Sequence, residues 1–196
     1  MPDDCVTVVS GLPRSGTSLM MQMLQAGGLS LLTDERRAAD KHNPRGYFEY
    51  EAVKNSRVDV SWLEQARGRA VKVIHLLLRH LPVDRPYRVL FMLRDVQEVI
   101  ASQRTMLKAS GRGGAQIPDD KLAGVFEQQL LEVRGWLAAR PNFRVLYVNY
   151  RDVLGDPFAA AQTIALFLGG KLDVSAMAGV VDRTLYRQRT ALKIAG

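Results

Sequence analysis

Residues 6–24 read V-T-V-V-S-G-L-P-R-S-G-T-S-L-M-M-Q-M-L, and they are the strongest indication of the fold in this sequence. A β-branched run is followed by a loop that contains Gly11 and Gly16, and Thr17 and Ser18 then open a segment with helical apolar periodicity. This order predicts a strand, a loop and a helix. The glycines permit a tight turn, so that backbone N–H groups of the loop and of the helix N-terminus can converge on one anion. The stretch therefore predicts a phosphate-binding loop.

The loop departs from the nucleotide-binding pattern G-x-x-x-x-G-K-[ST], because Thr17 stands where that pattern has lysine. In a nucleotide triphosphatase the lysine reaches the β- and γ-phosphates, and the next hydroxyl holds Mg²⁺. Here Arg14 supplies a fixed charge with a donor fork that suits phosphate or sulfonate oxygens. The loop thus favours a shorter 5′ anion held without a dedicated metal; the alternative is a capped turn that binds nothing.

A second informative segment covers residues 87–107, Y-R-V-L-F-M-L-R-D-V-Q-E-V-I-A-S-Q-R-T-M-L. Its apolar run is typical of a strand covered on both faces, and Arg94 stands at the carboxyl end, where open α/β sheets bind ligands. Asp95 can cap the helix that follows. Ser102, eight positions after Arg94, could help Arg94 hold a second phosphate. Taken alone, this pair favours the simpler explanation of a surface salt bridge and an ordinary helix serine.

Together the two segments resemble the sulfotransferases that use 3′-phosphoadenosine 5′-phosphosulfate (PAPS). The form P-R-S-G-T at residues 13–17 is most similar to the protein-tyrosine and glycan sulfotransferases and to small bacterial sulfotransferase-like proteins. Residues 145–157, V-L-Y-V-N-Y-R-D-V-L-G-D-P, are similar to a strand-then-Tyr segment late in that family's fold. The resemblance implies that Arg94 and Ser102 bind the 3′-phosphate. It also implies a site for the 5′-phosphosulfate made by Arg14, Ser15, Gly16, Thr17 and Ser18.

Strand and helix patterns alternate along the 196 residues. Such alternation implies a parallel sheet with helices on both faces. We expect an α/β fold, a P-loop NTPase-like three-layer sandwich with a central parallel sheet of four to five strands, in a single domain over residues 1–196. The glycine-rich residues 110–118 are expected to be a linker or a lid. The expected strands are 6–10, 70–75, 88–93 and 144–149, and the expected helices are 17–26, 50–66, 96–110, 119–139 and 157–168.

The composition and charge of the chain limit the classes of ligand and binding partner that we expect. The net charge of +7 and the pI of about 9.8 favour anionic ligands. The basic residues are scattered without aromatic interleaving or zinc-finger spacing, so nucleic acid is an unlikely partner. No cluster of His, Cys and carboxylates suggests a metal. The lone Cys5, the absence of a leader pattern and the absence of a long apolar run predict a cytoplasmic protein away from membranes.

Transfer of a sulfonate to a hydroxyl group needs cations for the charge on the moving group and a base for the acceptor proton. Lys72, in V-K-V-I-H, is the best candidate cation after Arg14. The resemblance implies that a lysine in this strand approaches the transferred sulfonate. The alternative is a lysine at a strand edge with its head in water.

Four residues are candidates for the base. Glu35 is the first choice, because the protein-tyrosine type uses a glutamate shortly after the first helix, and Asp34 is its register alternative. The usual meaning of a sequence such as D-E-R-R is a solvated charged loop. His75 follows Lys72 by three positions, and this odd spacing puts them on opposite faces unless the strand ends first. Glu49 ends the turn K-H-N-P-R-G-Y-F-E, which is similar to turns of bacterial sulfotransferase-like proteins and is expected to form a wall of the acceptor site, although an ordinary turn explains it as well.

We therefore expect transfer of a sulfonate from PAPS, with PAP as product and no metal, to a hydroxyl of a small-molecule or glycan acceptor. The alternatives are a P-loop small-molecule kinase or NTPase that uses ATP and Mg²⁺, and a catalytically inactive nucleotide-binding module. Two departures from the family pattern stand out. Leu19 occupies the position of a tryptophan that stacks on adenine in many small-molecule members. The C-terminal tail lacks the arginine-lysine-glycine loop that closes over the 3′-phosphate, where Arg187 and Arg189 could substitute.

Overall fold

A computed structural model describes residues 5–34, 36, 39–40, 43, 45–109, 111 and 117–185. Its centre is a four-stranded parallel sheet with the strand order β2-β1-β3-β4. The expected α/β fold with a central parallel sheet is confirmed. The strands are β1 (Val6–Gly11), β2 (Ala70–Lys72), β3 (Tyr87–Leu93) and β4 (Phe143–Asn149).

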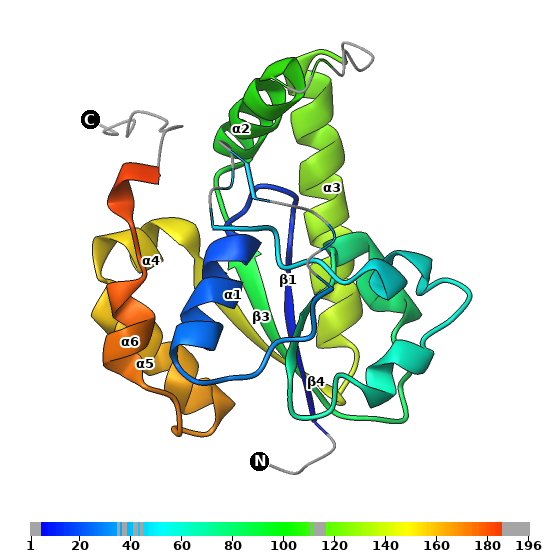
Figure 1. Ribbon diagram of the computed structural model, residues 1–196. Coiled ribbons are helices and arrows are strands. Elements are labelled where there is room, and N and C mark those ends of the chain that lie inside the picture. The colour runs from blue at the N-terminus through cyan, green and yellow to red at the C-terminus, as the bar shows by residue number, and fades with distance from the viewer. Residues whose placement is uncertain are drawn as a thin grey trace.

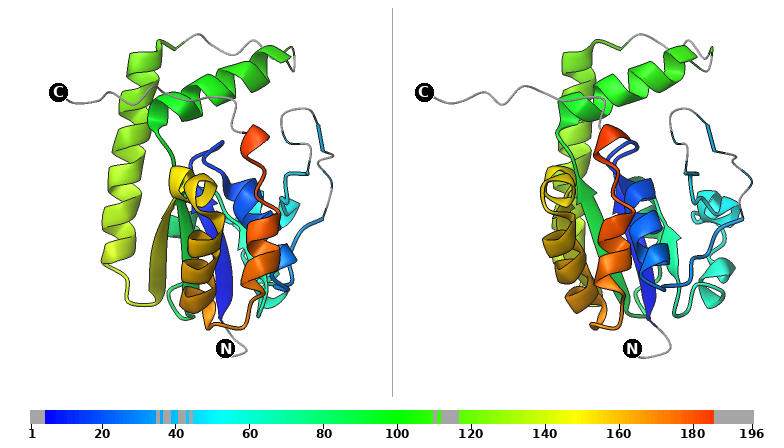
Figure 2. Two further views of the ribbon diagram at one scale, coloured as in Figure 1. Left: turned by 90° about the vertical axis from the view of Figure 1, so that its left-hand side faces the viewer. Right: turned by 60° about the vertical axis from the view of Figure 1, so that its left-hand side comes forward.

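Helices cover both faces of the sheet and make three layers (Figures 1 and 2). One face carries α1 (Thr17–Ala26), α4 (Tyr150–Gly155), α5 (Pro157–Leu168) and α6 (Val174–Gly179). The other face carries α3 (Asp119–Ala138) and the 3₁₀ helices η1 (Glu51–Asn55), η2 (Ser61–Glu64) and η3 (His75–His80). Helix α2 (Val96–Ala109) packs against α3 beyond the carboxyl ends of the strands, and a short 3₁₀ helix η4 (Arg183–Leu185) follows α6 (Figure 1).

Most residues of the central strands β1 and β3 are apolar, because both faces of these strands are buried. All six residues of β1 are buried. Val8 belongs to the core on the α3 side, whereas its neighbour Val9 belongs to the core on the α1 side. Phe91 and Met92 of β3 divide in the same way. This alternation follows from the two-residue period of a strand.

The structure corrects two of the expected elements. The helix expected over residues 50–66 is wrong, because two short 3₁₀ helices occupy this region. Between them the Asp59 side chain accepts a hydrogen bond from the Ser61 backbone N–H at 2.8 Å, a local bond that competes with a continuous helix. The strand expected over residues 70–75 ends at Lys72, and the apolar run continues as η3. A short apolar run does not distinguish a strand from a helix, which explains the error.

The other expected strands and helices agree with the structure to within one residue at each end. Helices α4 and α6 were not expected, because six residues are too few for a clear periodic signal. Most of the expected lid, Ser110 and residues 112–116, lies outside the described residues, as do Arg187 and Arg189.

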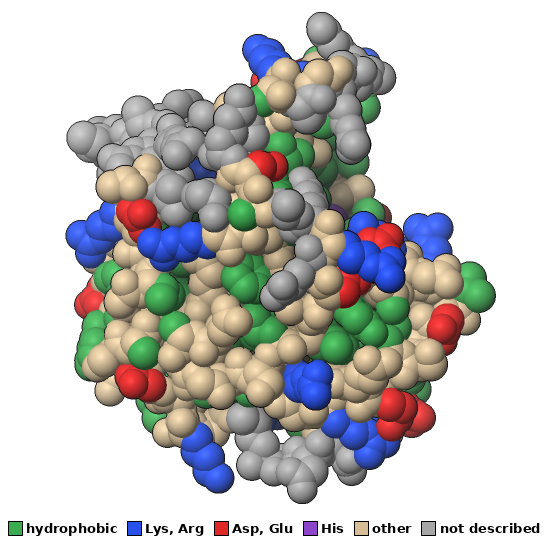
Figure 3. Space-filling model, in the orientation of Figure 1, with side chains coloured by type: hydrophobic (Ala, Val, Ile, Leu, Met, Phe, Trp, Pro, Cys, Tyr) green, Lys and Arg blue, Asp and Glu red, His purple; other side chains and the backbone are tan. Residues whose placement is uncertain are grey.

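On the face drawn in Figure 3, Lys and Arg side chains are interspersed with Asp and Glu. Several charged side chains of the described residues form ion pairs, for example Arg85 with Glu64 at 3.0 Å. The described part of this face therefore lacks a single-signed patch. In the described part of the chain, the helices are too short or too polar to span a bilayer.

Candidate active site

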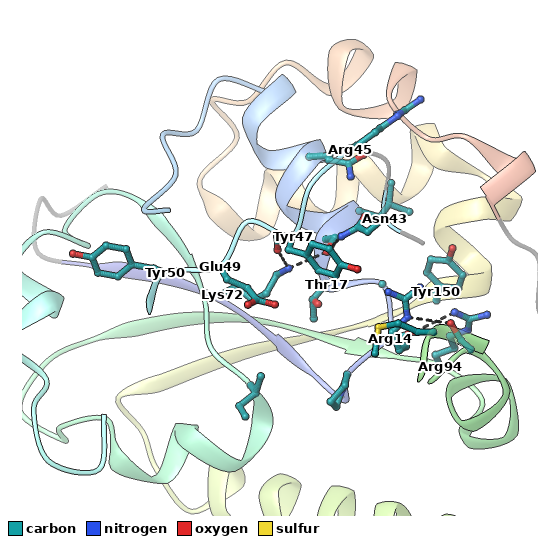
Figure 4. A pocket seen from close by; sticks show the side chains of 18 of the residues that line it. Arg14, Thr17, Asn43, Arg45, Tyr47, Glu49, Tyr50, Lys72, Arg94 and Tyr150 are labelled. Carbon is teal, nitrogen blue, oxygen red and sulfur yellow. Dashed lines mark hydrogen bonds between the residues drawn. The ribbon is translucent and has the colours of Figure 1, made fainter. Parts of the chain in front are cut away.

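A cavity of about 630 Å³ lies at the carboxyl ends of the strands. Each strand leads to a residue that lines it: Arg14 follows β1, Lys72 ends β2, Arg94 follows β3 and Tyr150 follows β4. Ligands of open α/β sheets bind at this edge, because the loops after parallel strands converge there. The cavity is therefore the candidate active site (Figure 4).

The loop after β1 depends on its two glycines. Gly11 has φ 144° and Gly16 has φ 105°, values that other residues rarely adopt. A Cβ atom at Gly16 would stand 2.5 Å from Cδ2 of Tyr150, so the loop and α4 pack too closely for a side chain. Arg14 itself has φ 71°, a left-handed conformation that is uncommon for arginine. The expected tight turn at the N-terminus of α1 is confirmed.

The two candidate anion-binding segments are joined by hydrogen bonds. Arg14 Nε donates to Ser102 Oγ on α2 at 3.1 Å. Arg94 Nη1 donates to the backbone carbonyl of Arg14 at 3.1 Å. Arg14, Arg94 and Ser102 therefore line one cavity although they are far apart in the sequence. From the sequence, only the family resemblance connected them.

Arg94 is held on two sides. Its Nε atom donates to Glu98 Oε2 at 3.0 Å, and its guanidinium lies over the Tyr150 ring, 4.7 Å from the ring centroid. The second oxygen of Glu98 accepts from Arg151 Nη2 at 2.6 Å. Sequence reasoning missed Glu98, Tyr150 and Arg151. The pairing of Arg94 with Glu98 could have been predicted, because the two residues are four positions apart at the beginning of a helix and residues at this spacing face each other.

The cap expected for α2 is present, because the Asp95 side chain accepts from the backbone N–H of Glu98 at 3.1 Å. This bond fixes the first turn of α2 directly after β3. The helix that carries Ser102 therefore starts in a defined direction from the end of the strand.

Lys72 reaches the first turn of α1 from β2, the strand beside β1. Its Nζ atom donates to Ser18 Oγ on α1 at 2.9 Å and also to the backbone carbonyl of Tyr47. Asn43 Nδ2 donates to the same Ser18 oxygen at 2.9 Å. The loop lacks the lysine of the nucleotide-binding pattern, yet the side chain of Lys72 brings a positive charge to its helix.

The turn before η1 forms a wall of the cavity. Asn43 and Gly46 close the turn, because the Gly46 N–H donates to the Asn43 carbonyl at 3.1 Å. Tyr47 and Glu49 follow and line the cavity, and the Glu49 carboxylate lies 4.0 Å from Lys54 Nζ. The turn and its position beside the cavity agree with the sequence prediction.

Three candidate residues, Ser15, Asp34 and His75, have side chains outside the cavity lining. Ser15 is buried, with its hydroxyl beneath Gly11. Asp34 instead accepts the backbone N–H of Glu51 at 2.7 Å; slight burial raises its pKa, but hydrogen bonds from Glu51 and Arg36 outweigh this and lower it. Glu35 lies outside the described residues.

His75 is the third. The strand does end before it, which removes the objection from spacing, but its Nε2 atom lies 2.9 Å from Gln129 Oε1 on α3. Burial lowers the pKa of His75. The structure thus places this imidazole in the core and does not bring it to the site.

The sequence was compared with models of protein families and the structure with solved structures. The family model for the sulfotransferase domain matches residues 4–193 of this chain. Two solved structures share the fold: the sulfotransferase domain from the Synechococcus PCC 7002 olefin synthase (17% identity, TM-score 0.55, 95% of this chain and 83% of that chain) and the sulfotransferase domain from the curacin biosynthetic pathway (18% identity, TM-score 0.51, 83% and 73%). Since the family model covers nearly the whole chain, the protein belongs to the sulfotransferase domain family.

Proposed function

We propose that this protein transfers the sulfonate group of PAPS to a hydroxyl group of an acceptor and releases PAP. The observation that carries the proposal is the direct connection of Arg14 and Arg94, through the Arg94 Nη1 bond to the Arg14 carbonyl at 3.1 Å. This bond puts the loops after β1 and β3 on one cavity. A nucleotide with an anionic group at both the 5′ and the 3′ position requires two such cationic loops side by side.

The residues present fit such a ligand. Arg14, Lys72 and the first N–H groups of α1 would hold the 5′ end, and Arg94 with Ser102 would hold the 3′-phosphate. Ser102 Oγ accepts its hydrogen bond from Arg14, so its own hydrogen can still be donated to a phosphate oxygen. When bound, PAPS supplies an activated sulfonate on a phosphate leaving group.

Lys72 and Arg14 have the positions needed to stabilise negative charge. Ser18 and the Tyr47 carbonyl hold the Lys72 ammonium before any ligand arrives. Preorganised donors of this kind stabilise developing charge more than water does, because they need no reorganisation during the reaction. In the proposed reaction they stabilise the sulfonate and the leaving oxygen.

Glu49 is the base that we propose from the described residues. Of the carboxylates in the described lining, Asp182 is the other one. Hydrogen bonds from Thr184 and the charge of Arg45 lower the pKa of Asp182, which makes it a weaker base. Glu35 remains a second candidate for the base, because the family resemblance suggests it.

The test is the melting temperature with PAP and, separately, with ATP and Mg²⁺, followed by transfer of labelled sulfonate from PAPS. A ligand at 100 times its Kd stabilises the native state by about 2.7 kcal/mol, so a bound nucleotide gives a clear rise. We expect a rise with PAP that EDTA does not change. Arg94→Met should reduce it, whereas Arg79→Met, at an exposed arginine outside the lining, should not. A rise with ATP and Mg²⁺ alone would support a kinase, and no rise would contradict nucleotide binding.

A further inference from the structure

The cavity has two chemically different ends. Figure 4 shows Arg14, Arg94 and Tyr150 on one side of Lys72 and Tyr50 on the other side, with Glu49 drawn beside Lys72. The first end carries the arginines assigned above to the nucleotide. The second end is therefore the space left for an acceptor.

The wall of this second end is largely apolar. Tyr50, Val53, Ile74 and Leu77 all line the cavity, and Val53 and Leu77 continue into the core on the α3 side. Ile74 is 43% exposed although it is one of the larger aliphatic residues. An apolar cavity wall that remains in contact with water gains most from a ligand with apolar surface.

Lys54 and Arg45, which also line the cavity, are paired with carboxylates. Lys54 Nζ lies 2.7 Å from Glu51 Oε2 and 4.0 Å from Glu49 Oε2. On the opposite rim, Arg45 Nη2 lies 3.6 Å from Asp182 Oδ2. With two carboxylates around Lys54, this end attracts an anionic acceptor less than an uncharged one.

The residues of the same wall offer few hydrogen-bonding groups to the hydroxyl groups of a sugar. The Tyr50 hydroxyl donates to Gln65 Oε1 at 3.2 Å, and the remaining wall residues are aliphatic. A sugar that packs there would lose water from several hydroxyl groups without gaining new partners from Val53, Ile74 or Leu77.

From these observations we infer the acceptor class: a small, uncharged alcohol or phenol with an apolar body. This inference rests on the proposed sulfotransferase function. The acceptor hydroxyl reaches Glu49 and Lys72, and the body packs on Tyr50, Val53, Ile74 and Leu77. The acceptor oxygen forms the new O–S bond as the bridging O–S bond of the phosphosulfate breaks; the electron pair stays on the phosphate of PAP, and the acceptor proton passes to Glu49. The product is a sulfate ester.

The experiment is calorimetric titration of the protein, with and without saturating PAP, with 2-naphthol and with methyl α-glucoside. We expect 2-naphthol to bind the PAP complex and methyl α-glucoside to give no binding at the same concentrations. Ile74→Asn should raise the Kd of 2-naphthol about tenfold by removing apolar contact, with the Kd of PAP unchanged. Asparagine is favoured at the N-cap position that Ile74 occupies, so the variant should fold. Val83→Asn, at an exposed valine outside the lining, is the matched control.

The outcomes separate this inference from the proposed function. If PAP binds but 2-naphthol does not, or if Ile74→Asn leaves its Kd unchanged, the acceptor class is overturned while the nucleotide site stands. Preferred binding of methyl α-glucoside overturns it as well. If PAP fails to bind, the proposed function fails; binding of 2-naphthol that still depends on Ile74 would then support an apolar ligand site alone.

Discussion

Glu98 holds Arg94 from within the protein. The carboxylate is 1% exposed and its Oε2 atom accepts from Arg94 Nε at 3.0 Å, while Oε1 accepts from Arg151 Nη2 at 2.6 Å. A buried carboxylate is stable only with charged or hydrogen-bonding partners, and Glu98 has two arginines among its partners. Glu98 therefore fixes the orientation of the guanidinium that we assign to the 3′-phosphate, and it acts as a positioning residue.

We predict that Glu98→Gln raises the Kd of PAP about tenfold, because one charge-assisted hydrogen bond that orients Arg94 is worth about 1.5–3 kcal/mol. Calorimetric titration with PAP measures the change. In an Arg94→Met background the same substitution should have no further effect, since the arginine that it positions is gone. A folded Glu98→Gln variant with unchanged PAP affinity would show that Glu98 serves the fold alone.

A second prediction concerns the close approach of Gly16 to Tyr150. Gly16→Ala should lower the free energy of unfolding by about 1–3 kcal/mol, because the new Cβ is both strained and in contact with the Tyr150 ring. Gly124→Ala, in the middle of α3 with open space around it, should instead stabilise by about 0.5–1 kcal/mol. Urea unfolding of both variants measures the difference. Equal effects at the two glycines would contradict the geometry of the loop.

The sequence predicted the fold well where strands are buried on both faces. The runs that became β1 and β3 are apolar because helices cover both sides of the sheet, so their pattern reports their environment directly. The same reasoning gave a wrong prediction, a continuous helix, for residues 50–66. Their apolar residues pack on the core from short 3₁₀ turns, and side-chain bonds such as that of Asp59 to the Ser61 N–H set the turns without a periodic signal.

The candidate site was predictable in part. Arg14 and Arg94 follow strands and Lys72 ends one. The topology of a parallel sheet brings the carboxyl ends of its strands together, so the proximity of these three residues follows from the fold. The position of His75 could not be predicted in this way. It depends on where β2 ends and on a partner, Gln129, that is 54 residues away in the sequence.

The third prediction tests the base. Glu49→Gln should lower the rate of sulfonate transfer by about 10²–10⁴-fold with the PAP affinity unchanged, as removal of a general base does. Asp34→Asn is the control, because Asp34 lies outside the lining and bonds to the Glu51 N–H. It should affect stability more than turnover. Glu35→Gln is measured beside them, and a large loss of turnover there, with none in Glu49→Gln, would assign the base to Glu35.

The last prediction is a pH dependence of stability. Burial of His75, together with the nearby charge of Arg79, lowers the pKa of its imidazole below the ordinary value, so the unfolded chain takes up a proton that the folded protein does not. The free energy of unfolding contributed by this group is therefore fully present above the unfolded pKa of about 6.5 and is lost as the pH falls below it, with a slope of at most about 1.4 kcal/mol per pH unit.

Urea unfolding between pH 7.5 and pH 5 checks this sign. We expect a smaller slope in His75→Gln, which keeps a polar group beside Gln129 but has no proton to gain. A lower absolute stability of that variant does not matter, since the slopes alone are compared. His80→Gln is the matched control at the half-buried histidine that ends the same 3₁₀ helix. This variant should keep the slope of the original protein if His75 is the responsible group. Equal slopes in the original protein and His75→Gln would contradict the buried, neutral state of this histidine.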